Sequence, residues 1–197
     1  MDNQKFIFDV ETTGLPIRER NNQLNYKNLI SFENCRIVSI SWIITYNNNN
    51  NKYAILEKGN YYVKPDNFII SDKSTEIHGL TLEILNKKGI PIEEIFNKLV
   101  DIFNKNKITE IISHNIKFDI NVLKSELVRY NSSVLLERIN SICTFCTMLN
   151  SQKIMNVYKW PKLSEAYHYF YKKDLQNAHD AEYDTLYCYN IYIAIAN

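Results

Sequence analysis

The sequence predicts an α/β fold, with a mixed five-stranded sheet flanked by helices. Two segments rich in β-branched and aromatic residues, 35–46 and 52–63, are separated by the run NNNNN at 47–51, which is typical of an antiparallel hairpin. From about residue 71 onward, helical periodicity alternates with short apolar runs, which indicates βα units. A hairpin followed by βα units favours a mixed sheet with helices against its faces.

The elements follow from this pattern, with the polar segment 16–34 expected to be a loop or lid. The helix expected at 91–106 carries its apolar residues at helical spacing and starts at Pro91. The elements expected in chain order are strands at 5–10, 35–46 and 52–63, helices at 81–89 and 91–106, a strand at 107–113, a helix at 118–130, a strand near 140–144, and helices at 145–153, 162–172 and 180–196. We find no internal repeat and no linker, so we expect a single domain over residues 1–197.

The composition is that of a globular protein, with 45% hydrophobic residues and a formal net charge of +1. A net charge near zero does not indicate a nucleic-acid partner. It does not exclude one either, because local lysines or bound metal ions can do the work of a basic net charge. The cysteines show one close pair, Cys143 and Cys146, without a second pair to complete a zinc site, so we expect free thiols in a reducing compartment.

The sequence shows no signal peptide and no apolar run of about 18 residues, which predicts a soluble intracellular protein without membrane partners, in the cytoplasm or nucleus. Frequent Asn, Lys, Ile and Tyr are typical of AT-rich genomes, including those of large viruses.

Two carboxylates lie at the end of the first expected strand. Asp9 and Glu11 are two residues apart, so in a strand both point to the same face, and Thr13-Gly14 then turns the chain. Strand ends are where α/β sheets build their sites. The alternative is a solvated acidic edge or a cap for the turn.

Two later segments add three candidate residues. Asp119 follows the strand expected at 107–113, where its alternative role is a helix N-cap. His179 and Asp184 lie just before and one turn inside the last expected helix, so both can face one pocket. Their alternatives are a capping histidine and a solvated helix face.

Together, four acids and a histidine indicate a metal site. Carboxylates gathered in one pocket repel each other and need cations, and hard oxygen ligands suit Mg²⁺ or Mn²⁺. Two such ions can stabilise both the attacking and the leaving oxygen of a phosphoryl displacement. A neighbouring histidine can act as the base for the attacking water, so the pattern predicts phosphodiester hydrolysis.

Three motifs resemble those of the DEDD superfamily of 3′→5′ exonucleases, which includes DnaQ-like proofreading domains and ribonuclease T-like enzymes. They are FDVETTGL at 8–15, HNIKFD at 114–119 and HDAEYD at 179–184, in the family's order and across essentially the whole chain. His179 lies five residues before Asp184, as in the histidine subgroup (DEDDh), and IHGLT at 77–81 also resembles that subgroup.

The resemblance implies a ribonuclease H-like fold, a two-metal site and release of nucleoside 5′-monophosphates from the 3′ end of single-stranded DNA or RNA. By motif position, Asp9 bridges two Mg²⁺ or Mn²⁺ ions, Glu11 and Asp184 hold the ion that carries the attacking water, and Asp119 helps to hold the other. His179 is then the general base. The implied substrate-binding residues are Thr12, Leu15 as a wedge against the terminal base, His78, Asn115 and Phe118, the last of which alternatively belongs to the core.

Other features leave alternatives open. The segment 153–162 offers Lys153, Lys159 and Lys162 with Tyr158 and Trp160 as strand contacts, or is a solvated loop with packed aromatics. His114 is expected to be a polar loop residue. No polymerase-binding tail follows the last helix, which favours a stand-alone enzyme, and some relatives are homodimers.

The competing functions are a catalytically silent nucleic-acid-binding or scaffolding module on the same fold, and a structural acidic cluster. The presence of all four acids and the histidine favours the enzyme. The sequence does not distinguish DNA from RNA, or a single strand from a duplex end.

Overall fold

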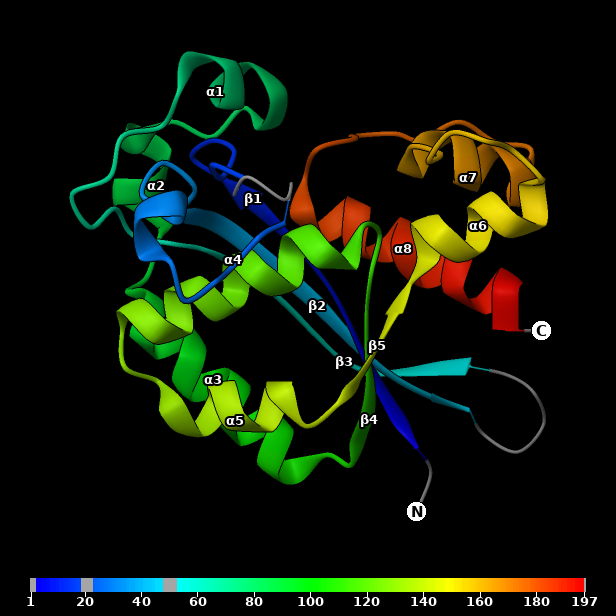
Figure 1. Ribbon diagram of the computed structural model, residues 1–197, viewed down its shortest axis with the longest axis horizontal. Helices are drawn as coiled ribbons and strands as arrows, with labels where there is room; N and C mark the ends of the chain where they lie inside the picture. The colour runs from blue at the N-terminus through cyan, green and yellow to red at the C-terminus, as the bar shows by residue number, and fades with distance from the viewer. Residues whose placement is uncertain (1–2, 19–22, 48–52, 197) are drawn as a thin grey trace.

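A computed structural model describes residues 3–18, 23–47 and 53–196, and it has the mixed five-stranded sheet that the sequence predicts (Figure 1). The order of strands across the sheet is β3-β2-β1-β4-β5. β1 pairs antiparallel with β2, and β2 with β3, whereas β4 runs parallel to both β1 and β5. The strands are β1 (Gln4–Thr12), β2 (Ile37–Asn47), β3 (Tyr53–Tyr62), β4 (Ile108–Ser113) and β5 (Cys143–Cys146).

The helices agree with the prediction in most places and extend it in three. They are η1 (Leu29–Phe32), α1 (Asp72–His78), α2 (Leu82–Lys88), α3 (Ile92–Lys105), α4 (Ile116–Arg129), α5 (Ser133–Asn140), α6 (Thr147–Met155), α7 (Leu163–Tyr171) and α8 (Ala181–Ala196). The short helix η1 lies within the expected loop 16–34, and α1 and α5 were not predicted. Both α1 and α5 span eight residues or fewer, and α1 has no buried residue, so neither carries a clear apolar stripe. Residues 48–52, which include most of the asparagine run, lie outside the described residues.

The side chains of β1 alternate between two differently covered faces of the sheet. Phe6, Phe8 and Val10 belong to the main core, where α3, α4 and α5 pack. Ile7 points the other way and packs with Cys188 and Tyr192 of α8. Figure 1 shows α8, with α6 and α7 beside it, on the opposite side of the sheet from α3 and α5. Because alternate residues share a face, Asp9 and Glu11 lie on the α8 side.

The register of β2 keeps space open beside these two acids. Asp9 lies opposite Ser41 and Glu11 opposite Ser39, so the cross-strand neighbours on the α8 face are small hydroxyl residues rather than large apolar ones. Further along the same face, Ile43 lies opposite Ile7 and packs against α8. The sheet is therefore hydrophobic at one end of this face and polar at the end where β1 finishes.

Two further expectations concern the cysteines and membranes. All four cysteines are free thiols, as predicted, and three of them are buried. Among the helices of the described residues, none combines the length and apolarity needed to span a bilayer.

Candidate active site

Asp119 lies in the first turn of α4 and is oriented by two donors from the sheet. The backbone N–H of Val10 donates to its Oδ1 atom (3.4 Å), and the Ser113 hydroxyl, at the end of β4, donates to its Oδ2 atom (2.6 Å). Only 3% of Asp119 is exposed. The alternative role of Asp119 as a helix N-cap is therefore wrong, because α4 already begins at Ile116, and the carboxylate faces the end of β1.

Asp184 and His179 come together at the start of α8, as their spacing predicts. The backbone N–H of His179 donates to Asp184 Oδ2 (3.2 Å), and His179 adopts a left-handed backbone conformation (φ 67°). Asp184 is buried, so the solvated-face alternative is wrong, and its Oδ1 atom has no hydrogen-bond partner among the described residues. A buried carboxylate oxygen without a donor is costly unless a cation binds it.

Three of the predicted residues converge closely enough to share one ion. One ligand atom each from Glu11, His179 and Asp184 lie within 4.8 Å of one another. Carboxylate oxygens with one imidazole suit Mg²⁺, Mn²⁺ or Zn²⁺. Together with the unpartnered Oδ1 of Asp184, this donor set fits a divalent cation, so the residues present agree with the metal that the resemblance implies.

The acids raise one another's pKa in addition to the effect of burial. Burial is the largest cause for each of the four, and it raises the pKa of Glu11 to about 8, of Asp119 to about 7 and of Asp184 to about 6. The pKa of Asp9 is also raised, first by burial and then by repulsion from Asp119, Glu11 and Asp184. Asp9 therefore lies close enough to Asp119, Glu11 and Asp184 for their charges to affect its carboxyl.

The ion pairs between described residues leave this cluster without a lysine or arginine partner, although, against the effect of burial, the charge of His179 lowers the pKa of Asp184. Its ion pairs join lysines, arginines and His168 to other acids, and none includes Asp9, Glu11, Asp119 or Asp184. Asp180, which the sequence did not single out, adds a further negative charge that raises the pKa of Asp9 and Glu11. It also caps α8, because its Oδ1 atom accepts the backbone N–H of Glu182 (2.9 Å).

The turn after β1 is held in a defined shape beside the acids. The Thr12 hydroxyl donates to the carbonyl of Gly14 (2.8 Å), so Thr12 is buried in the turn itself. The His78 ring accepts the N–H of Leu80 at Nδ1 (3.0 Å), which leaves Nε2 as the donor to the Thr12 carbonyl (3.2 Å). Leu15 is 74% exposed and projects from this turn.

Asn115 and Phe118 lie where β4 passes into α4. Asn115 has a left-handed backbone conformation (φ 71°), and its carbonyl accepts the N–H of Phe118 (2.8 Å). Phe118 is partly buried and packs against the main core, so its core alternative is confirmed in part.

Sequence reasoning missed the residues that support these acids. Ser113 orients Asp119. His114 lies in the turn after β4, as expected of a polar loop residue, and is in addition bonded at both ring nitrogens. A serine or histidine at a strand end carries no signal of such contacts, because the partners of His114 are 33 and 47 residues away.

A cavity of about 400 Å³ lies beside the site, between β2, β3 and the first turn of α8. It is lined by residues that include Lys58, Asn60, Glu182 and Tyr183, and Asn60 donates to Glu182 (3.0 Å). None of the four clustered acids lines it, so it is a neighbour of the carboxylate site rather than the site itself.

Known proteins share both this sequence pattern and this fold. Residues 6–192 match the family model RNase_T, described as "Exonuclease". The chain is 32% identical over 148 residues to DNA polymerase III subunit epsilon of Buchnera aphidicola subsp. Schizaphis graminum, a match that covers 75% of this chain and 53% of that subunit.

Two solved structures show the same architecture at low sequence identity. Exonuclease I of E. coli, in complex with a dT13 oligonucleotide, has a TM-score of 0.71 at 16% identity over 97% of this chain and 40% of that chain. A 3′-exonuclease described in 3′-end-specific recognition of a histone mRNA stem-loop has a TM-score of 0.62 at 11% identity, over 99% and 64% of the two chains. These structures confirm the ribonuclease H-like fold, and this chain spans about half of the curated relative and two fifths of Exonuclease I. Because the family model matches nearly the whole of this chain, the chain belongs to the exonuclease family, as its three DEDD-type motifs predict.

Proposed function

We propose that the protein is a metal-dependent 3′→5′ exonuclease of the histidine subgroup, which removes nucleoside 5′-monophosphates from the 3′ ends of single-stranded DNA or RNA. The observation that carries this proposal is the convergence of Glu11, His179 and Asp184 within 4.8 Å, beside a buried Asp184 oxygen without a donor. The oligonucleotide complex of Exonuclease I supports a single-stranded substrate.

Two Mg²⁺ or Mn²⁺ ions would be held by four carboxylates, those of Asp9, Glu11, Asp119 and Asp184. The ions supply positive charge that offsets the repulsion between the acids and stabilises the negative charge that develops on the phosphate. The chain's own contribution is to keep the ligands in place, as the Val10 and Ser113 donors do for Asp119.

His179 takes the proton of the attacking water at a ring nitrogen. The water oxygen forms a bond to phosphorus as the bond from phosphorus to the 3′ oxygen breaks. The leaving 3′ oxygen takes a proton from solvent, so the products are a 3′-hydroxyl on the shortened strand and a nucleoside 5′-monophosphate. The ring of His179 is exposed, so it can reach solvent to lose that proton. Leu15, Thr12, His78, Asn115 and Phe118 are the proposed contacts of the terminal nucleotide.

The same cluster favours a second role for His179, as a metal ligand, because a ring nitrogen lies within 4.8 Å of a carboxylate oxygen of both Glu11 and Asp184. An imidazole that binds a metal ion with its available nitrogen does not take a proton from water. One solved relative, E. coli Exonuclease I bound to single-stranded DNA, is described in a zinc-bound form. The two roles predict different behaviour of a His179→Ala variant.

A 5′-labelled oligonucleotide tests the activity. With Mg²⁺ or Mn²⁺ we expect a ladder that shortens by one nucleotide at a time from the 3′ end, with nucleoside 5′-monophosphate as the product, and a loss of about 10³-fold or more in Asp9→Asn. Exposed Asp101→Asn on α3 is the matched control. Internal cuts, or no metal-dependent cleavage of any DNA or RNA end, would contradict the proposal.

His179→Ala separates base from ligand. If His179 is the base, the variant loses activity, retains the affinity for Mn²⁺ and regains part of its rate as pH rises and hydroxide replaces the missing base. If His179 is a ligand, Mn²⁺ affinity falls together with activity.

A further inference from the structure

The loop between α6 and α7, residues 156–162, presents two large aromatic side chains to solvent. Tyr158 is fully exposed and Trp160 is 65% exposed. Of the two tryptophans in the chain, the other, Trp42, is only 2% exposed and stacks on Tyr61 in the core. Two exposed large aromatics in one short loop are typical of a binding surface rather than of a solvated connection.

Hydrogen bonds hold the backbone of this loop in place, although the side chains of Tyr158 and Trp160 are exposed. Gln152 donates to the carbonyl of Tyr158 (2.9 Å), and Glu165 accepts the backbone N–H of Lys162 (2.9 Å). His114 Nε2 lies 3.0 Å from the carbonyl of Pro161, which is buried. Because that carbonyl only accepts, Nε2 is the donor, and Nδ1 accepts from the Thr147 hydroxyl (3.0 Å). A loop whose backbone is already ordered binds without the entropic cost of ordering that backbone.

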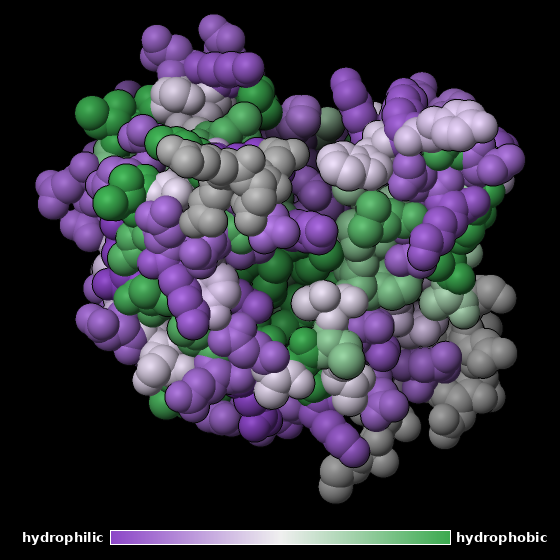
Figure 2. All heavy atoms as spheres, in the orientation of Figure 1, coloured by the Kyte–Doolittle hydropathy of each residue, from purple (hydrophilic) through white to green (hydrophobic). Residues whose placement is uncertain are grey.

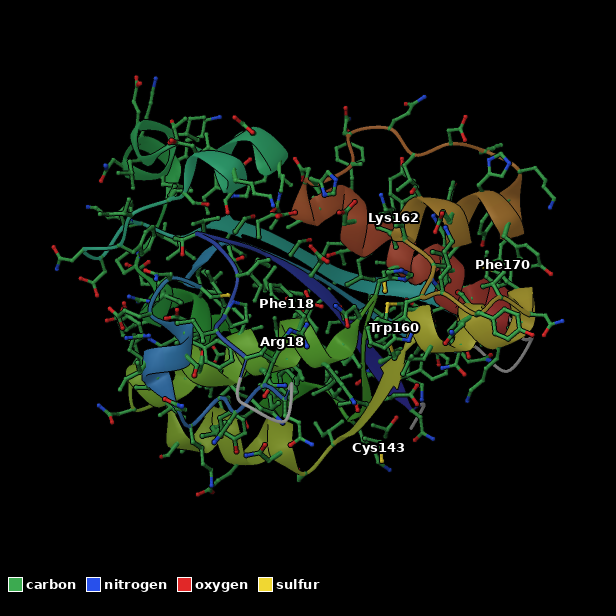
Figure 3. The ribbon with its side chains drawn as sticks, turned by 45° about the horizontal axis from the view of Figure 1, so that its top comes forward. Arg18, Phe118, Cys143, Trp160, Lys162 and Phe170 are labelled. Atoms are coloured by element: carbon green, nitrogen blue, oxygen red, sulfur yellow. The ribbon has the colours of Figure 1, made fainter. Side chains whose placement is uncertain are left out.

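His114 also connects this loop to the catalytic edge of the sheet. It directly follows β4 and precedes Asn115, so the loop is attached to the strand end that positions Asp119. In Figure 3, Trp160 and Lys162 lie on the face that also shows Phe118 and Arg18. Figure 2 shows a hollow with hydrophobic side chains in its floor, between the surface over α4 and the surface over α6 and α7.

The charge of this region suits a polyanion. Residues 147–164 contain three lysines and no acid. Lys153 and Lys162 are exposed, while Lys159 pairs with Glu165. On the α4 side, Lys117 is exposed as well. The loop that His114 attaches to the end of β4 therefore carries exposed positive charge.

We propose that Tyr158 and Trp160 form a stacking platform for unpaired bases upstream of the 3′-terminal nucleotide, with Lys153 and Lys162 beside the phosphates of that strand. This inference rests on the proposed function and extends it: the enzyme prefers single strands long enough to reach the loop. A duplex offers no free base faces to stack on the aromatic rings. The exposed lysines favour a nucleic acid over a protein as the occupant, and the exposed aromatic rings favour a single strand over a duplex.

Chain-length dependence tests the platform. We compare kcat/KM for a 12-nucleotide strand with kcat/KM for a dinucleotide, using both deoxythymidine and uridine oligomers with Mg²⁺. In the double variant Tyr158→Ala/Trp160→Ala, the ratio of the long to the short substrate falls at least about tenfold, since each base stacked on an aromatic contributes a comparable factor. Tyr169→Ala, which removes a partly exposed aromatic of α7, keeps the wild-type ratio.

Salt dependence tests the lysines. For Lys153→Ala/Lys162→Ala, the slope of log kcat/KM against log salt on the 12-nucleotide strand becomes shallower by about 1.4, because each phosphate contact on a single strand contributes about 0.7. The control Lys87→Ala/Lys88→Ala, on exposed residues of α2, keeps the slope.

The emission of Trp160 separates this inference from the proposed function. Quenching of wild-type fluorescence by the 12-nucleotide strand in EDTA, lost in Trp160→Ala, supports the platform even if no strand is cleaved. If the wild type cleaves strands but shows no quenching, or if the aromatic double variant keeps the wild-type length ratio, the platform is wrong and the exonuclease stands. A surface used by a protein partner predicts this second result.

Discussion

The protein buries carboxylates in two regions and offsets their charge in different ways. Between β2 and α4, Glu126 is paired with Arg36 through two contacts, from Nε to Oε1 (2.6 Å) and from Nη2 to Oε2 (3.2 Å), and Tyr130 lies 3.0 Å from the same guanidinium. At the end of β1, four carboxylates lie together without such a partner among the described basic residues.

The pKa shifts express this difference. Burial raises the pKa of Glu126, but the hydrogen bond and charge of Arg36 act in the opposite direction. For Glu11, burial raises the pKa to about 8, and each neighbouring acid adds to the rise. The charge of Glu126 is compensated by Arg36 within the fold, whereas the proposed metal ions would compensate the charge of the second region.

The largest expected effect comes from breaking the internal pair. Glu126→Leu leaves the Arg36 guanidinium buried without its partner, and we expect the free energy of unfolding to fall by about 3–5 kcal/mol. Denaturant titration measures this fall. In the double variant Arg36→Met/Glu126→Leu most of the loss is expected to be recovered, and a double variant as unstable as the single one contradicts this assignment.

The acidic cluster is expected to respond to pH in the metal-free protein. Its carboxyls have folded pKa values above their unfolded values, so the native state binds more protons than the unfolded state, and the free energy of unfolding falls as pH rises through the folded pKa values. Between pH 6.5 and 8, in EDTA, we expect a fall of about 2 kcal/mol. Addition of Mg²⁺ or Mn²⁺ should restore most of the lost free energy of unfolding at pH 8, and it should stabilise the protein only a little at pH 6.5.

Two other buried groups, His114 and Cys35, do not contribute to the change in the free energy of unfolding between pH 6.5 and 8. Burial lowers the pKa of His114 to about 4, so its neutral ring costs stability only as pH falls below the unfolded value near 6.5. Burial raises the pKa of the Cys35 thiol to about 12, which matters only above the ordinary range near 8.5. Stability that is flat or rising from pH 6.5 to 8 would contradict the account of the cluster.

A smaller effect distinguishes Glu11 from the rest of the protein. Glu11→Gln removes one of the repelling charges, so the metal-free variant at pH 8 should be more stable than the wild type by about 1 kcal/mol, while its activity is lost. Exposed Glu76→Gln on α1 is the matched control and should change neither. A Glu11→Gln variant that is less stable in EDTA would show that the carboxylate serves the fold instead.

The two regions also differ in how far the sequence could predict them. Asp9 and Glu11 share a strand face by their spacing, and His179 and Asp184 lie around one helix start, so local periodicity and the family motifs were sufficient to bring them together. The Arg36–Glu126 pair joins residues 90 positions apart. No local pattern indicates such a contact, because it follows from how α4 packs against the start of β2.

The same reason explains the helices and supporting residues that were not predicted. α5 buries only Leu135 and Ile139, so its helical form depends on packing against α3 and α4 rather than on a strong stripe of its own. Ser113 and His114 acquire their roles from partners that the tertiary fold brings near, Asp119 and the carbonyl of Pro161.

The central claim is that the cluster at the end of β1 binds two divalent ions, and a calorimetric titration of the EDTA-treated, dialysed protein with Mn²⁺ at pH 8 tests it most directly. The account predicts saturation at two ions per chain, a reduced stoichiometry or affinity in Asp9→Asn, and wild-type binding in the Asp101→Asn control. Absence of saturable binding, or binding that Asp9→Asn leaves unchanged, would contradict it.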